Sequence, residues 1–177
     1  MTTVRVYVPT TLPDMSGRVR VAADGRPDDP RAVVADPGAV AFAVTPGLRE
    51  WYRDGDLEEL EYVAFTHAAR ASLRNLASSP LNGAARRVVL AIDIADSDAV
   101  VAPEIDLSAV RVGAAVTLDV VAAVHVDDPS AAPDVEAAAR VVAAADAGDD
   151  DAQFVVDGLD DHELQWYAVQ EIAALLG

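Results

Sequence analysis

Two short clusters in the sequence combine histidine with carboxylates, and these residue types together could bind a metal ion. The first is His125-Val-Asp127-Asp128, at the end of an expected strand, where positions 125 and 127 project from the same face. The second lies around His162, at an expected helix start. Imidazole nitrogen and carboxylate oxygen together suit zinc, manganese or iron. His125, Asp127, Asp128 and His162 are therefore the candidate ligands of a metal-dependent, hydrolase-type enzyme.

Both clusters also have a purely structural explanation. The chain contains 22 Asp residues, so an Asp close to a histidine is expected by chance. The first cluster fits a strand that ends in an Asp-Asp-Pro turn, and Asp160 with Glu163 has the spacing of a capping box. On this explanation the protein binds no cofactor, and a divalent metal remains the alternative.

Other chemistries are excluded by residues that the chain lacks. It has no cysteine, which removes disulfides, thiolate metal sites and cysteine nucleophiles. It has no lysine, which removes Schiff-base chemistry and the lysine of a phosphate-binding P-loop. Neither the G-x-S-x-G nucleophile motif nor a G-x-G-x-x-G dinucleotide motif is present.

The net charge of −17 belongs entirely to the second half of the chain. Residues 1–92 carry equal numbers of acidic and basic side chains, whereas residues 93–177 carry 19 acidic side chains against Arg111 and Arg140. A negative field of this kind repels phosphate backbones, so we expect no nucleic-acid partner. We also expect no membrane association, because no apolar run approaches about 18 residues, and a cytoplasmic location. A basic protein partner or self-association would suit the acidic half.

Apolar and alternating segments predict four or five strands. These segments cover residues 4–8, 39–44, 88–92, 110–112 with 114–116, and 121–126. Residues 10–38 hold proline, glycine and charged residues of both signs, and they predict a long connection.

Helix-start signals predict four helices. They run from Pro46 to Asp54, from Asp56 to about Ser78, from Pro133 to Ala145, and from Asp160 to the end of the chain. Thr45 before Pro46 is a typical N-cap, and Asp56 with Glu59 has capping-box spacing. A turn at Asn82-Gly83 should follow the second helix.

Two features of these helices bear on function. His67 shares a helix face with Arg70 and Arg74, opposite the aromatic face, and we expect it to be exposed to solvent. Trp166 could line a pocket, but it lies beside the apolar stripe of the last helix, so we predict that it is a core anchor.

These elements predict an α+β fold. We expect one domain over residues 1–177, with a four- to five-stranded mixed sheet covered by helices. The C-terminal helix should dock on the core, because its stripe is apolar to the end of the chain.

Several segments together resemble a known family. They are Arg5-Val-Tyr-Val-Pro9, Ala43-Val-Thr-Pro46, Leu48-Arg-Glu-Trp-Tyr52, Asp149-Asp-Asp-Ala-Gln153 and His162-Glu-Leu-Gln-Trp-Tyr167. In this combination the chain resembles an actinobacterial family of small proteins classed as a domain of unknown function. The resemblance implies a cytoplasmic bacterial protein and a helix after the first strand. It implies no activity, cofactor or catalytic residue.

Two hypotheses of function follow. The favoured one is a small acidic binding or regulatory module without catalysis. The other is the metal-dependent enzyme that uses the histidine and aspartate clusters. Convergence of the two clusters in one pocket would favour the enzyme, and scattered surface positions would favour the module.

Overall fold

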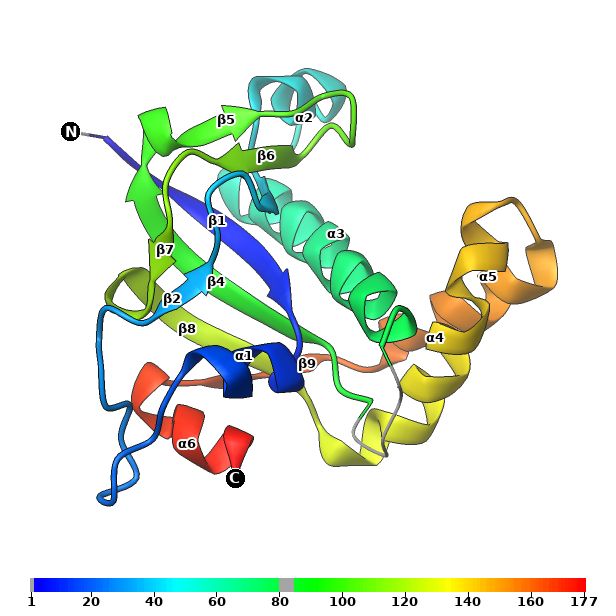
Figure 1. Cartoon of the computed structure of the whole chain (residues 1–177). Coiled ribbons are helices and arrows are strands. Elements are labelled where there is room, and N and C mark those ends of the chain that lie inside the picture. Colours follow the sequence, from blue (N-terminus) through cyan, green and yellow to red (C-terminus); the bar gives the residue numbers. More distant parts are fainter. Residues whose placement is uncertain (1, 80–84) are drawn as a thin grey trace.

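Seven strands form one sheet in the computed structural model, which describes residues 2–79 and 85–177. The strands lie in the order β5-β6-β3-β1-β4-β8-β9, and every neighbouring pair is antiparallel (Figure 1). Their bounds are β1 Thr3–Thr10, β3 Val40–Ala43, β4 Val88–Ala95, β5 Ala99–Val101, β6 Ala109–Val112, β8 Val121–Asp127 and β9 Leu164–Tyr167. A separate two-stranded sheet pairs β2, Val33–Ala35, with β7, Val116–Thr117.

The fold is α+β, but the predicted four- to five-stranded mixed sheet is wrong. The central strands were visible in the sequence because β1, β4 and β8 are long and buried. Both edge strands of the large sheet were missed. They have only three and four residues, too few for a period-2 pattern to show, and they form only where a neighbouring strand supplies hydrogen bonds.

The C-terminal segment differs most from the prediction of a single helix that begins at Asp160. Residues Gly158–Asp161 form a turn of 3-10 helix, η4, and the chain then enters β9. After β9, a 3-10 turn over Val169–Glu171 leads into the short α-helix α6, Ile172–Leu176, and the fully buried Ile172 packs it on the core. The spacing of Asp160 and Glu163 resembles a capping box, but no side chain caps η4.

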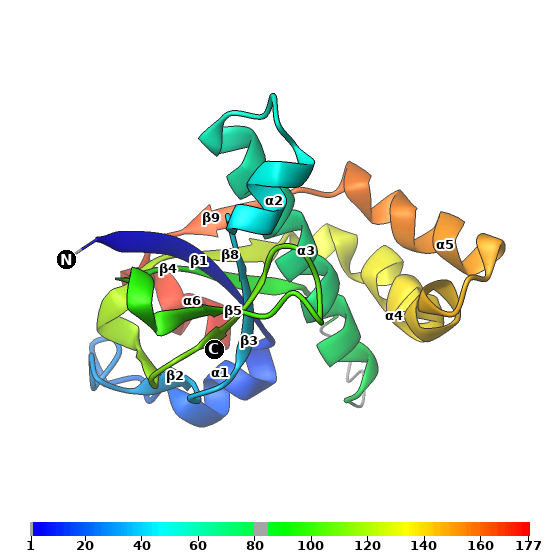
Figure 2. The same cartoon turned by 90° about the horizontal axis from the view of Figure 1, so that it is seen from above.

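The face of the sheet that carries Val6 and Val8 is covered over most of its area, and only residues near the strand ends, such as Val4 and Ile94, stay partly exposed. Helix α1, Leu12–Arg18, helix α6 and the β2–β7 sheet pack on it (Figures 1 and 2). Its core includes Met15 from α1 and Ile172 from α6, both fully buried. This layer is a closed aliphatic core.

The opposite face carries the alternate residues of the same strands, and a single long helix covers it only in part. Helix α3, Leu57–Ala77, runs along this face beside β1 and β4 and packs on β1, β3 and β4 (Figure 1). Its small residues Ala64 and Ala68 meet Tyr7 and Phe42 of the sheet. The β8–β9 side of this face therefore lies beside α3, not under it.

Two further helices form a layer beyond the sheet. Helix α4, Ala132–Asp146, and helix α5, Asp150–Asp157, pack on each other and on the C-terminal part of α3 (Figure 2). The predicted helix from Pro133 to Ala145 is confirmed by α4. The short α5 begins at the N-cap Asp149, whose carboxylate accepts a hydrogen bond from the Ala152 amide at 2.8 Å.

The predicted helix starts in the middle of the chain are confirmed. Thr45 caps α2, Pro46–Trp51, and Asp56 and Glu59 form a reciprocal capping box at the start of α3. The predicted turn at Asn82-Gly83 lies outside the described residues. None of the described helices is both long and apolar enough to cross a membrane.

Residues 10–38 contain the helix that the family resemblance implied and that the residue pattern did not predict. Thr11 caps α1, and its hydroxyl oxygen accepts a hydrogen bond from the Asp14 amide at 3.2 Å. Pro13 lies in the first turn, where a missing N–H costs nothing. Proline in this segment is therefore a helix-start signal as much as a loop signal.

Candidate functional site

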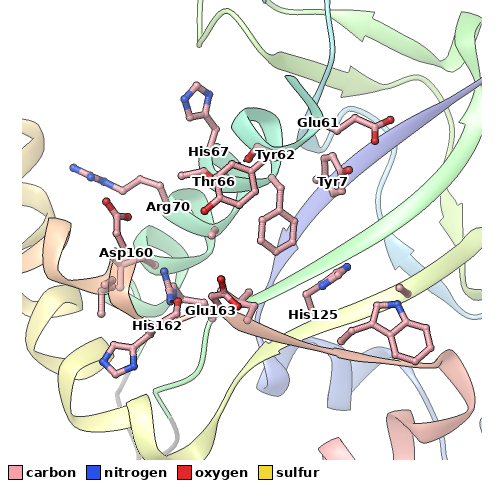
Figure 3. A pocket seen from close by; sticks show the side chains of 18 of the residues that line it. Tyr7, Glu61, Tyr62, Thr66, His67, Arg70, His125, Asp160, His162 and Glu163 are labelled. Carbon is pink, nitrogen blue, oxygen red and sulfur yellow. Dashed lines mark hydrogen bonds between the residues drawn. The ribbon is translucent and has the colours of Figure 1, made fainter. Parts of the chain in front are cut away.

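A cavity of about 610 Å³ opens between α3 and the β8–β9 edge of the sheet. We call it the α3–β9 cavity. Helix α3 forms one wall, strands β1, β8 and β9 form the floor, and the segment from α5 through η4 closes one end (Figure 3). Residues from four distant parts of the sequence therefore meet on the incompletely covered face of the sheet.

The α3 wall follows from helical spacing. Glu58, Glu61, Tyr62, Phe65 and Thr66 lie three or four positions apart and thus share one stripe of the helix. The stripe faces the cavity, while the neighbouring alanines face the sheet. Tyr62 is 68% exposed, so this wall presents a largely open aromatic ring.

The floor is set by strand register. His125 of β8 pairs directly with Trp166 of β9, and their side chains share the cavity face of the sheet. Tyr7 of β1 lies on the same face. Phe65 of the helix meets the sheet edge-on, with ring centroids 4.9 Å from His125 and 5.6 Å from Tyr7. Three rings thus join the wall to the floor.

Two titratable groups of the floor, His125 and Tyr7, are held neutral. Burial lowers the pKa of His125, and the positive charge of Arg5 lowers it further. Burial raises the pKa of Tyr7 to about 12, and the negative charge of Glu61 adds to this shift. At neutral pH the imidazole and the phenol therefore contribute aromatic surface and hydrogen-bonding groups without charge.

Three arginines line the cavity, and each is paired with an aspartate that does not line it. Arg5 pairs with Asp93 at 2.7 Å, Arg87 with Asp127 at 2.8 Å, and Arg70 with Asp146 at 3.5 Å. The Nε atom of Arg70 is buried and has no hydrogen-bond partner in the described part of the chain.

Four carboxylates line the cavity without such partners. Within residues 2–79 and 85–177, no ion pair joins a basic side chain to Glu58, Glu61, Asp160 or Glu163. Figure 3 shows Glu61 on the α3 wall and Asp160 and Glu163 at the η4–β9 end. The cavity is therefore aromatic inside and carries an excess of negative charge.

The four residues predicted as metal ligands are only partly brought together. His125 and His162 both line the cavity, the first from β8 and the second from the segment before β9. Asp128 is exposed and caps the following turn, where its carboxylate accepts a hydrogen bond from the Ser130 amide at 2.9 Å. His162 contacts a different carboxylate, since its Nε2 lies 2.8 Å from Asp134.

Asp127 has a structural role at the corner where β8 ends and β4 begins. It is fully buried and accepts hydrogen bonds from the backbone N–H and from Nε and Nη2 of Arg87, each at 2.8 Å. The same guanidinium donates to the carbonyl oxygen of His162 at 3.0 Å. This buried pair therefore anchors the segment that leads into β9.

In the described ranges, no three His, Asp or Glu side chains lie close enough together to hold a metal ion. The pairing of Asp127 with Arg87 explains part of this result, because both carboxylate oxygens are already bound. Only the histidines of the two predicted clusters, His125 and His162, line the same cavity.

Two further predictions about side chains are wrong. His67 is half-buried, with Nδ1 2.7 Å from Ser108 Oγ and 3.0 Å from Asp106, because the loop before β6 folds over α3. Trp166 is 62% exposed and lines the cavity, because its segment is an edge strand and not a buried helix. Of the two roles that the sequence allowed for Trp166, the structure supports the one in which it lines a pocket.

Other cavity residues were not singled out in the sequence. A signal did exist at Arg5 and Tyr7, which place polar groups on one face of an otherwise valine-rich strand. Glu61 carried none, since a polar residue on a helix usually faces solvent. Tyr62 did carry one, because it lies on the aromatic face of the helix predicted from Asp56 to about Ser78, but it faces the cavity opening and not the core.

Comparison with known families gives one match. The sequence model of DUF6912, a family of unknown function, matches residues 4–176. This chain belongs to the DUF6912 family. No curated protein and no solved structure matches it. The family assignment covers every element that forms the α3–β9 cavity, from β1 to β9, and it brings no activity with it.

Proposed function

We propose that this DUF6912 protein is a non-catalytic binding module and that the α3–β9 cavity is its ligand-binding site. The observation that carries the proposal is the cavity itself. At about 610 Å³ it has the size of a small-molecule site, and such sites combine apolar and aromatic walls with a few polar groups.

The exposed rings support binding. Tyr62 comes from α3 and Trp166 from β9, and both are too exposed to fill the core. Large exposed aromatic side chains at a concave site are typical of recognition surfaces, because a ligand can bury them at little cost in side-chain entropy.

The arrangement of the histidines favours binding over catalysis. A general base needs a second group that orients its ring and a reacting group within hydrogen-bond reach. In the described part of the chain, the ring of His125 contacts Phe65 and makes no hydrogen bond to a carboxylate or hydroxyl. His67 and His162 are each engaged with an aspartate on the periphery.

The composition of the whole chain supports a proposal for the partner class, the cellular location and the source of the protein. A net charge of −17 disfavours nucleic acid as a partner and favours a basic one. The absence of cysteine agrees with a cytoplasmic location, and the use of arginine as the sole strongly basic residue agrees with an actinobacterial source.

A variant that fills the cavity tests this function. Thr66 lies on the cavity stripe of α3 and is exposed, so Thr66→Trp should occupy the opening without disturbing the core. Asn75→Trp places the same side chain on an exposed position of the same helix outside the cavity. We expect ligand-observed NMR with a fragment library to find binders to the wild type and to Asn75→Trp that are lost in Thr66→Trp.

Two outcomes would contradict the proposal. One is a library with no binder to the folded wild-type protein. The other is a set of binders that Thr66→Trp retains in full, which would show that the fragments bind elsewhere.

A further inference from the structure

We infer that the group held in the α3–β9 cavity is an organic cation, an alkylammonium or guanidinium group. The inference rests on the proposed function of the cavity as a ligand site and adds the charge class of the ligand. It is carried by two independent features of the walls, their charge and their aromatic surface.

The net charge of the cavity lining depends on which of its charged side chains are already paired with an opposite charge. Arg5 and Arg87 are held in bidentate hydrogen bonds by Asp93 and Asp127, which do not line the cavity. The positive charge of each guanidinium is therefore balanced by a carboxylate of the protein. The lining carboxylates have no such partners among the described residues. A ligand entering the cavity therefore meets a surplus of negative charge, which repels anions and attracts cations.

Both α3 and the segment that leads into β9 bring an aromatic ring and a carboxylate to the lining. On α3, Glu61 is followed directly by Tyr62. In the other segment, Glu163 lies just before β9, which carries Trp166. A cation between these walls can contact the faces of tyrosine and tryptophan while its N–H groups donate to the two carboxylates. This combination of ring face and carboxylate is how proteins recognise alkylammonium and guanidinium groups.

The deeper part of the cavity suits an uncharged portion of the same ligand. It is lined by Phe65 of the α3 wall and, on the floor, by Ala123 and the neutral ring of His125. The buried Nε of Arg70 is a donor that a carbonyl or hydroxyl oxygen could satisfy. It does not favour an anion, because the guanidinium already faces Asp146 and lies 3.9 Å from Asp157.

An organic cation of this class can come from two sources. It can be a free amine or guanidine, or it can be the end of a lysine or arginine side chain on a basic protein partner. The chemistry that the cavity recognises is the same, and the probes below distinguish the two.

A matched series of probes tests the charge class. 2-Phenylethylamine, 2-phenylethanol and phenylacetate share a ring and chain but differ in charge, and agmatine offers a guanidinium group. In a Trp51→Phe background, Trp166 is the sole tryptophan and reports binding by fluorescence. We expect the amine and agmatine to bind at least about tenfold more tightly than the alcohol or the acid, with affinity falling at high salt.

Two double variants that remove the same charge show whether cation binding depends on the carboxylates of the cavity. Glu61→Gln with Glu163→Gln should weaken cation binding by about tenfold or more, because it removes one carboxylate from α3 and one from the segment that leads into β9. Glu50→Gln with Asp96→Asn removes the same charge from exposed positions that do not line the cavity, and it should change affinity by less than about twofold.

A Gly-Arg-Gly peptide with both termini blocked distinguishes a free ligand from a side chain on a protein partner, when its affinity is compared with that of agmatine. Binding of the peptide as tightly as agmatine supports a basic protein partner, and binding of agmatine alone supports a free amine or guanidine.

The inference is overturned if the anion or the neutral probe binds as well as the amine, or if the glutamine pair behaves like its control. In that case the proposed function still stands when Thr66→Trp abolishes binding of the uncharged or anionic fragments. If no fragment of any charge depends on the cavity, the proposed function fails as well.

Discussion

The two faces of the seven-stranded sheet are built from the same strands and have opposite properties. Along β1, Val6 and Val8 enter a closed aliphatic core, while Arg5 and Tyr7 face the α3–β9 cavity. Along β8 the same alternation separates Val124 from His125. Because strand side chains alternate, one set of strands can supply a stable core on one face and a recognition surface on the other.

The two faces of the sheet differ because one is covered by several elements and the other by a single helix. On the covered face, α1, α6 and the β2–β7 sheet enclose an aliphatic cluster, where a polar group without a partner would be costly. On the other face a single helix spans only part of the sheet, and the uncovered strip beside β8 and β9 can hold charge and exposed rings. Stability and binding are therefore expected to respond to different substitutions.

The largest effect is expected at the buried ion pair below the cavity. Asp127→Ala leaves the buried guanidinium of Arg87 without its partner and should lower the free energy of unfolding by about 3–5 kcal/mol. Asp128→Ala, at the exposed neighbouring position, should cost much less. Urea denaturation of both variants measures the difference, and equal midpoints would show that the pair does not anchor β9.

A second pair of variants compares the two faces directly. Leu90→Ala empties a fully buried site on the covered face and should cost about 2–5 kcal/mol. Trp166→Ala removes a larger side chain from the cavity face and should cost less than about 1 kcal/mol, because that side chain is mostly exposed. A larger loss for the tryptophan would mean that the cavity face is part of the core.

A smaller, pH-dependent effect is expected from His125. Its pKa is lowered in the folded protein by burial and by Arg5, so below about pH 6.5 the unfolded chain binds more protons than the folded one. The stability that the neutral imidazole retains at pH 7 should therefore be lost as the pH falls through its lowered pKa. Between pH 7 and 5 the wild type should lose more stability than His125→Gln in urea denaturation. Parallel curves would place this ring in an open, hydrated site.

The smallest expected effect concerns metal content. Of the predicted ligands, only His125 and His162 line the cavity. Asp127 is bound to Arg87, and His162 contacts Asp134. We expect elemental analysis of protein purified without chelator or histidine tag to find no stoichiometric zinc, manganese or iron. About one metal ion per chain, lost on His125→Ala, would instead restore the metal-dependent enzyme and make the cavity face catalytic.

The sequence by itself determined the parts that depend on neighbours along the chain. Alternation in β1 and β8 and the caps at Thr45 and Asp56 could be predicted, because strand pleat and orphan helix N–H groups act over only a few residues. The missing lysine and cysteine removed whole classes of chemistry without reference to any fold.

Only the tertiary structure decided the role of the segment around Trp166. Its apolar residues fit a helical stripe as well as a short strand, and local preference could not choose between them. Pairing with β8 and the link from Arg87 to the carbonyl of His162 select the strand. That choice turns a predicted core anchor into a cavity wall, because an edge strand leaves one of its faces open where α3 does not reach.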